Sequence, residues 1–110
     1  MLTKEDAQRI GARVVGDLFE ALRRLKIPER QAAPILGRTG QMLHLWKKTP
    51  PQGFRDLMNV QELTAYLEGV PEEDAARYRE SPRARGEFLL NLRWHFGVRG
   101  EETPPSTEGE

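Results

Sequence analysis

The amino-acid sequence predicts an all-α fold, a small bundle of five or six helices. Apolar residues recur at the three- and four-residue spacing of amphipathic helices in several separate stretches, and no stretch alternates as a β-strand does. Proline and glycine lie between these stretches, where they end helices and form turns. The 110 residues, 37% of them hydrophobic, suffice for one domain with a small core. We place this domain at residues 1–97.

The first predicted helix spans about residues 3–25. Thr3 is a suitable N-cap, and acidic residues follow it in the first turn. Gly11 and Gly16 lie inside the helix, where each costs roughly 1 kcal/mol relative to alanine. We therefore expect these glycines to admit the close approach of another helix. The apolar residues of this stretch are Ala7, Ile10, Val14, Val15, Leu18, Phe19, Leu22 and Leu25.

The next two predicted helices are short, and a glycine separates them. Pro28 ends the first helix and can serve as the first residue of a second helix, over about 28–36. Gly37 stops that helix. Thr39 is a fair N-cap for a third helix, over about 40–48.

The second half of the chain predicts three further helices and a tail. The rigid connector TPPQG at 49–53 precedes a helix over about 54–68, and a short charged helix covers 71–80. Ser81-Pro82 is typical of an N-cap followed by a first helical residue, so a last helix begins there and extends to about 96. The chain ends in GEETPPSTEGE, which is acidic, proline-rich and without apolar residues, so we expect residues 98–110 to be disordered.

Several classes of protein are disfavoured by what the sequence lacks. It has no cysteine for disulfides or thiolate metal sites, which fits a cytoplasmic protein, and no apolar run long enough to cross a membrane. The charged N-terminus is not a signal peptide. His44 and His95 lie on different predicted helices, and there is no glycine-rich phosphate loop. We expect no enzyme activity, no catalytic or metal-binding residues, and no cofactor.

The formal net charge of zero hides an asymmetry along the chain. Residues 1–50 carry ten Lys/Arg against five Asp/Glu, residues 51–97 carry six against eight, and residues 98–110 carry one against four. The basic first half favours a nucleic-acid partner, whereas the neutral total weakly disfavours one. The acidic second half could instead face a protein partner.

The residues around Gly37 follow a characteristic spacing. Ala33 precedes the glycine by four residues, and Leu43 and Trp46 follow it by six and nine. This spacing resembles the helix-turn-helix of the lambda-repressor, Cro and Xre-like regulators, over residues 28–48. The sequence departs from the family at Arg38, where an apolar residue is usual, and at Pro34, which removes a backbone donor within the second helix. Ordinary packing of short helices in a bundle is the alternative.

The resemblance implies sequence-specific binding of double-stranded DNA by a bacterial or phage transcriptional regulator, a repressor or an activator, acting as a dimer. Its third helix would be the recognition helix. Gln41 could bond an adenine edge, His44 could donate to a guanine, and Leu45 could touch a thymine methyl group. The side chains of Lys47 and Lys48 would contact phosphates, or would only complement the helix dipole. The expected DNA-binding residues are Arg30, Gln31, Arg38, Thr39, Gly40, Gln41, His44, Leu45, Lys47 and Lys48.

A second, weaker resemblance covers residues 58–80, which are similar in outline to the helix-turn-helix of excisionase and MerR-like proteins. Ala65 precedes Gly69 by four residues, and Ala75 and Tyr78 follow it at the matching spacing. The second helix of this pair would begin with the acidic run EED, which would repel phosphates. These acids also suit a helix N-terminus. A structural role is therefore the expectation here, with contact to a basic partner as the alternative.

The last predicted helix carries apolar residues around more than one face. Because helix-turn-helix regulators commonly bind two half-sites as dimers, we expect it to form a homodimer interface. It could equally close the monomer core over the first helix, and both roles are compatible. The expected interface residues are Phe88, Leu89, Leu92, Trp94 and Phe96.

Two rival functions stay open at this level. The chain could be a protein-interaction module with a helix-turn-helix shape, such as a phage inhibitor or adaptor that docks on the transcription machinery. It could also be a small phage subunit that holds DNA during packaging. The neutral total charge keeps both rivals open.

Overall fold

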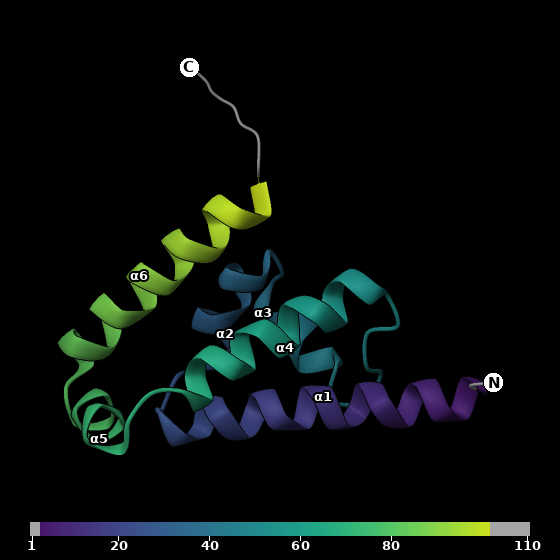
Figure 1. The fold of residues 1–110 in the computed structure, drawn as a ribbon, viewed down its shortest axis with the longest axis horizontal. Helices are drawn as coiled ribbons and strands as arrows, with labels where there is room; N and C mark the ends of the chain where they lie inside the picture. Colours follow the sequence, from purple (N-terminus) through teal and green to yellow (C-terminus); the bar gives the residue numbers. More distant parts are fainter. Residues whose placement is uncertain (1–2, 102–110) are drawn as a thin grey trace.

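The computed structural model describes residues 3–101, with side chains described for residues 3–96. These residues form six α-helices and one 3₁₀ turn, and no strand occurs among them. The predicted all-α bundle is therefore confirmed (Figure 1). The helices are α1 (Lys4–Arg24), α2 (Glu29–Ala32), α3 (Gly40–Leu45), α4 (Phe54–Glu68), α5 (Glu72–Glu80) and α6 (Pro82–Glu101), and the 3₁₀ turn η1 (Ala33–Leu36) follows α2 directly.

Helices α1 and α4 lie side by side and run in the same direction (Figure 1). Near their N-terminal ends, Gly11 allows the connector before α4 to approach α1. A Cβ at Gly11 would lie only 3.0 Å from the Cβ of Pro50 and 3.3 Å from the carbonyl oxygen of Pro51. The close approach expected at Gly11 is thus made by a connector. At Gly16 the expectation was wrong, because no atom lies within 4 Å of the added Cβ.

An arginine cluster joins the C-terminal ends of α1, α4 and α5. The guanidinium of Arg24 donates to the carbonyl oxygens of Leu67 (3.3 Å) and Val70 (2.7 Å), at and just beyond the C-terminal end of α4. Arg79 donates to the Arg24 carbonyl oxygen at 3.0 Å and to Glu72 at 2.6 Å. Contact with Arg79, and more weakly with Arg24, holds the pKa of the Glu72 carboxyl below its ordinary value.

The core fills the space between α1, α3 and α4. Its largest fully buried side chains come from three helices and from the turn after α1: Leu18, Leu25, Leu43, Val60, Leu63 and Leu67. Helix α6 packs across η1 and closes the core with Leu92 and Phe96. This burial of apolar surface from elements far apart in the chain is the main source of stability.

The predicted helix caps are confirmed at three positions. Thr3 and Asp6 form a capping box, in which the Thr3 hydroxyl accepts from the Asp6 backbone at 3.0 Å. The hydroxyl of Thr39 accepts from the Met42 backbone at 3.1 Å, and the hydroxyl of Ser81 accepts from the Ala84 backbone at 3.1 Å. These bonds satisfy amide groups that the first turn of a helix leaves unpaired.

The boundaries differ from the prediction in two places. The predicted helix at 28–36 is divided into α2 and η1, because Pro34 has no amide hydrogen to continue the α-helical pattern. The last helix was expected to end near residue 96, but its backbone continues to Glu101 since no proline interrupts it before residue 104. Residues 98–101, predicted to be disordered, are thus helical; the rest of the predicted tail lies outside the described residues.

The chain reverses direction between η1 and α3 through a left-handed backbone at Gly37, with φ 69°. The amide of Arg38 donates to the Ala33 carbonyl oxygen and the amide of Gly37 donates to that of Pro34, both at 3.0 Å. This pair of bonds is the Schellman arrangement that ends helices at a glycine. We call the unit made of α2, η1, Gly37 and α3 the α2–α3 corner.

Replacing Gly37 with alanine is expected to lower the free energy of unfolding by about 1–2 kcal/mol, the cost of a left-handed residue that has a Cβ. An added Cβ meets no atom within 4 Å, so only the backbone contributes. Gly16→Ala is the matched control, also in open space but inside a helix, and should raise stability by up to about 1 kcal/mol. Denaturant titration measures the free energy of unfolding of both variants. If both substitutions destabilise the protein, or both stabilise it, the left-handed backbone at Gly37 does not explain the effect there.

Candidate nucleic-acid interface

Four exposed side chains form a stripe on one side of the α2–α3 corner. They are Gln41, His44 and Leu45, whose spacing i, i+3 and i+4 places them on one face of α3, and Lys48, in the turn that follows α3. Leu43 and Trp46 lie on the opposite side of this segment and are buried, at 0% and 4% exposure. Since burial of these two residues fixes the rotation of α3, it also directs the stripe outward. We call these four residues the α3 stripe.

Two polar groups of the stripe, those of Gln41 and Lys48, are available for a ligand. Within the described part of the chain, neither the Gln41 amide nor the Lys48 ammonium forms a hydrogen bond or an ion pair with another residue. Leu45 is 51% exposed although it is apolar. An exposed leucine flanked by free polar groups is suited to contact with another molecule, but this pattern alone does not identify that molecule.

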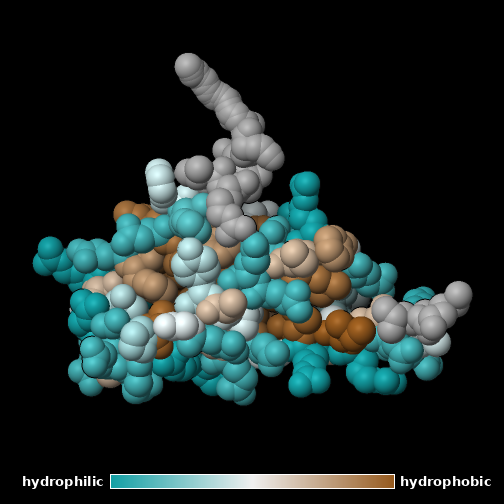
Figure 2. All heavy atoms as spheres, viewed as in Figure 1, coloured by the Kyte–Doolittle hydropathy of each residue, from teal (hydrophilic) through white to brown (hydrophobic). Residues whose placement is uncertain are grey.

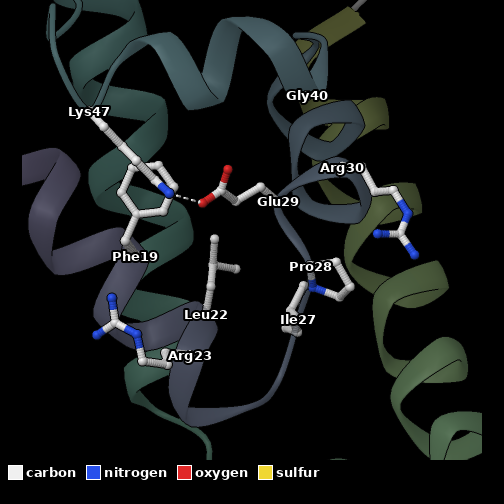
Figure 3. Close-up of a pocket in the computed structure, with 9 residues that line it drawn as sticks. All are labelled: Phe19, Leu22, Arg23, Ile27, Pro28, Glu29, Arg30, Gly40 and Lys47. Atoms are coloured by element: carbon white, nitrogen blue, oxygen red, sulfur yellow. Dashed lines mark ion pairs between the residues drawn. The ribbon is translucent and has the colours of Figure 1, made fainter.

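Arg30 and Gln31 lie at the start of α2, next to the N-terminal end of the stripe. A Cβ at Gly40 would lie 3.3 Å from the Arg30 Cα and 3.4 Å from its Cβ, so α3 begins directly against α2. The glycine predicted to open the helix terminus to a phosphate thus has a packing role. The guanidinium of Arg30 makes no ion pair with the described residues. In Figure 3 it points away from Glu29 and Lys47.

Glu29 forms a cluster of charges beneath the stripe. One carboxylate oxygen lies 2.5 Å from Nζ of Lys47, and the other lies 3.4 Å from Nδ1 of His44. The Lys47 ammonium also lies 4.9 Å from the centre of the Phe19 ring, a cation–π distance. Figure 3 shows Lys47 and Glu29 meeting above Phe19. Lys47, predicted to contact DNA, therefore ties the turn after α3 to α2 and α1.

The ionisation of Glu29 reflects these contacts. Partial burial raises the pKa of the Glu29 carboxyl, but contact with Lys47 and His44 outweighs burial and leaves the pKa below its ordinary value of 4.5. An open pocket of about 520 Å³ borders the cluster, lined by Phe19, Leu22, Arg23, Ile27, Pro28, Glu29, Arg30, Gly40 and Lys47. Its basic side chains are engaged in part, because Arg23 pairs with Glu20 at 3.0 Å and Lys47 pairs with Glu29.

Two further predicted residues have partners inside the molecule. The guanidinium of Arg38 pairs with Asp56 of α4 at 2.6 Å, which ties the corner to the long helix. The hydroxyl of Thr39 is used as the N-cap of α3. The expected set of ten is thus divided. The residues without an ion pair or hydrogen-bonded side chain in the described structure are Arg30, Gln31, Gln41, Leu45 and Lys48, and His44 is exposed but touches Glu29.

Residues 58–80 lack the left-handed corner found at Gly37. Gly69 has φ −77°, in the right-handed helical region, and Glu72 pairs with Arg79 and Arg24. Ala75 is fully buried, and Tyr78 stacks on Phe88 with ring centres 4.6 Å apart. These residues pack within the fold, and the expectation of a purely structural role for the segment stays a prediction.

The residues predicted for a dimer interface fall into two groups. Leu92 and Phe96 are buried in the monomer core, and Phe88 and Leu89 pack partly against it, so this helix closes the core, but mainly across η1 and not over the first helix as the alternative had it. Trp94 is 71% exposed, and Leu90, four residues before it, is 68% exposed. Among the side chains of α6 that the structure describes, this outer pair is the large apolar surface left exposed to cover a partner.

Sequence reasoning missed Glu29 and Asp56. Each lies in the first turn of a helix, where an acidic residue is explained by the helix dipole alone. Their partners are 15 to 18 residues away along the chain, and only the angle of the corner brings them together.

Comparisons with models of protein families, with curated proteins and with solved structures found no match to this chain. Among the described residues, no helix combines the length and apolar character needed to cross a membrane. In the same part of the chain, no three His, Cys, Asp or Glu side chains gather as a metal site would require.

Because the pKa of Glu29 is lowered, its contacts stabilise the fold fully above about pH 4.5 and are lost as the pH falls through the lowered pKa. Glu29→Gln is expected to destabilise the protein at neutral pH, and the difference from wild type should shrink as the pH falls below 4.5. Thermal unfolding across this range measures it. Glu20→Gln, which removes an exposed pair with Arg23, is the control and should change little. A constant difference at every pH would contradict the account.

Proposed function

We propose that the α2–α3 corner is a helix-turn-helix and that the chain binds double-stranded DNA through it, as a transcriptional regulator that acts by occupying its site. The observation that carries the proposal is the α3 stripe, whose free polar groups project from the side opposite buried Leu43 and Trp46. An exposed helix with such side chains fits the major groove, which is wide enough to admit an α-helix.

The chemistry of the stripe suits base edges and phosphates. The Gln41 amide can pair with the N6 and N7 atoms of adenine, and Leu45 can contact the methyl group of thymine. Lys48 and Arg30 lie at either end of this surface and form no ion pair with the described residues, so both cations can pair with phosphates. Lys47 and Arg38, in contrast, would have to leave Glu29 and Asp56 first.

The exposed pair Leu90 and Trp94 supports a dimer within this proposal. The two side chains are four residues apart on α6, so they share one face, and that face lies away from Leu92 and Phe96. A partner covering them would remove large apolar side chains from water. Two copies would present two α3 stripes, as binding to paired half-sites requires.

A protein-interaction module is the second candidate, favoured by the surface of α4. Phe54 is 77% exposed, and Met58 lies four residues further along the helix, also exposed. On the face shown in Figure 2, apolar side chains form several separate patches among hydrophilic ones. A protein partner could bind over such a patch, and this candidate requires no affinity for DNA.

Lys48→Ala is expected to weaken duplex binding and to reduce the slope of log affinity against log salt concentration by about 1, as one lost phosphate contact does. Lys4→Ala, an exposed lysine of α1 outside the corner, is the matched control and should leave the slope unchanged. Fluorescence anisotropy with a labelled duplex at several salt concentrations measures both. Equal slopes for both variants and the wild type would argue against Lys48 at a phosphate, and absence of duplex binding would favour the protein-interaction module.

A further inference from the structure

Glu29 controls more than the position of Lys47, because it also touches the ring of His44. The ring lies in the α3 stripe, with its Nδ1 atom 3.4 Å from a Glu29 carboxylate oxygen and with 69% of its side chain exposed. The second ring nitrogen, Nε2, makes no contact with the described residues. One nitrogen therefore faces the protein, and the other is open to a ligand.

The carboxylate determines which nitrogen carries the proton. An anionic oxygen repels a lone pair on Nδ1 and attracts a proton there, so the neutral ring holds its hydrogen on Nδ1. Glu29 stays ionised throughout the range where histidine titrates, since its pKa lies below 4.5. In the neutral ring, Nε2 is then a hydrogen-bond acceptor, and in the protonated ring it becomes a donor.

The charges around the ring come from two elements. Glu29 approaches from α2, and Lys47, on the segment that follows α3, neutralises the other carboxylate oxygen. The η1 turn, APIL, contributes no titratable side chain, and α1 contributes the uncharged Phe19 beneath Lys47. Glu29 is thus the group that contacts His44 directly and biases its proton.

We infer that Glu29 is a positioning residue that makes the base preference of His44 depend on pH, with cytosine favoured by the neutral ring, guanine or thymine by the protonated ring, and adenine compatible with both. In the major groove, the amino groups of adenine and cytosine are donors that match an acceptor at Nε2. The N7 and O6 atoms of guanine and the O4 atom of thymine are acceptors that match a donor at Nε2, and adenine has the acceptor N7 beside its amino group, so it matches both forms of the ring. This inference rests on the proposed function, and it restricts the guanine contact expected for His44 to its protonated form.

The test is selection of bound duplexes from a random pool at about pH 8 and about pH 5.5. For the wild type, one position of the enriched site is expected to change from cytosine at the higher pH to guanine or thymine at the lower pH, with a preference of about tenfold at each pH. His44→Ala should lose the preference at that position alone. Glu29→Gln removes the charge, so the high-pH preference should weaken while the other positions persist.

A second measurement separates this inference from the proposed function. Nitrogen NMR of the His44 ring in the full chain without DNA should show the hydrogen on Nδ1 in the wild type and a mixture of tautomers in Glu29→Gln. His95, whose Nε2 lies 2.8 Å from the Tyr66 hydroxyl, is the internal control and should not change. A hydrogen on Nε2 in the wild type would overturn the inference, as would an enriched site that is identical at both pH values. If no duplex is enriched, the proposed function fails and the base preference fails with it.

Discussion

The left-handed backbone at Gly37 is the constraint on which the proposed interface depends. Two hydrogen bonds from the amides of Gly37 and Arg38 close η1, and the chain then turns so that Thr39 can begin α3. This direction places Leu43 and Trp46 in the core, and burial of these side chains fixes which face of α3 meets solvent. The outward direction of the stripe is therefore a consequence of core packing, because it is set by the buried residues on the other side of the segment.

Ion pairs divide the cations of the corner into two kinds. Lys47 and Arg38 are bound to Glu29 and Asp56, and these pairs join α3 to α2 and the corner to α4. Lys48 and Arg30 have no such partner among the described residues. Net charge cannot make this distinction. A count of Lys and Arg overstates the positive charge available to a ligand, since part of it is neutralised inside the fold.

Much of the fold could be predicted because its signals are local. Caps at Thr3, Thr39 and Ser81 and the break at Gly37 depend on backbone conformation and on neighbours within four residues. The contacts of Glu29 could not be predicted, since they depend on the angle between helices that contact each other across the corner. The same limit applies to Gly16, whose sequence position resembles that of Gly11 but whose surroundings are open.

The most direct test of the central claim is an amide NMR titration of the isotope-labelled full chain with a mixed-sequence duplex at low salt. The account predicts that the largest shift changes fall on Arg30, Gln31 and residues 39–48, because backbone contacts to phosphates do not need a particular sequence. Changes concentrated on the exposed surface of α4 or at Leu90 and Trp94, or no changes at all, would contradict it.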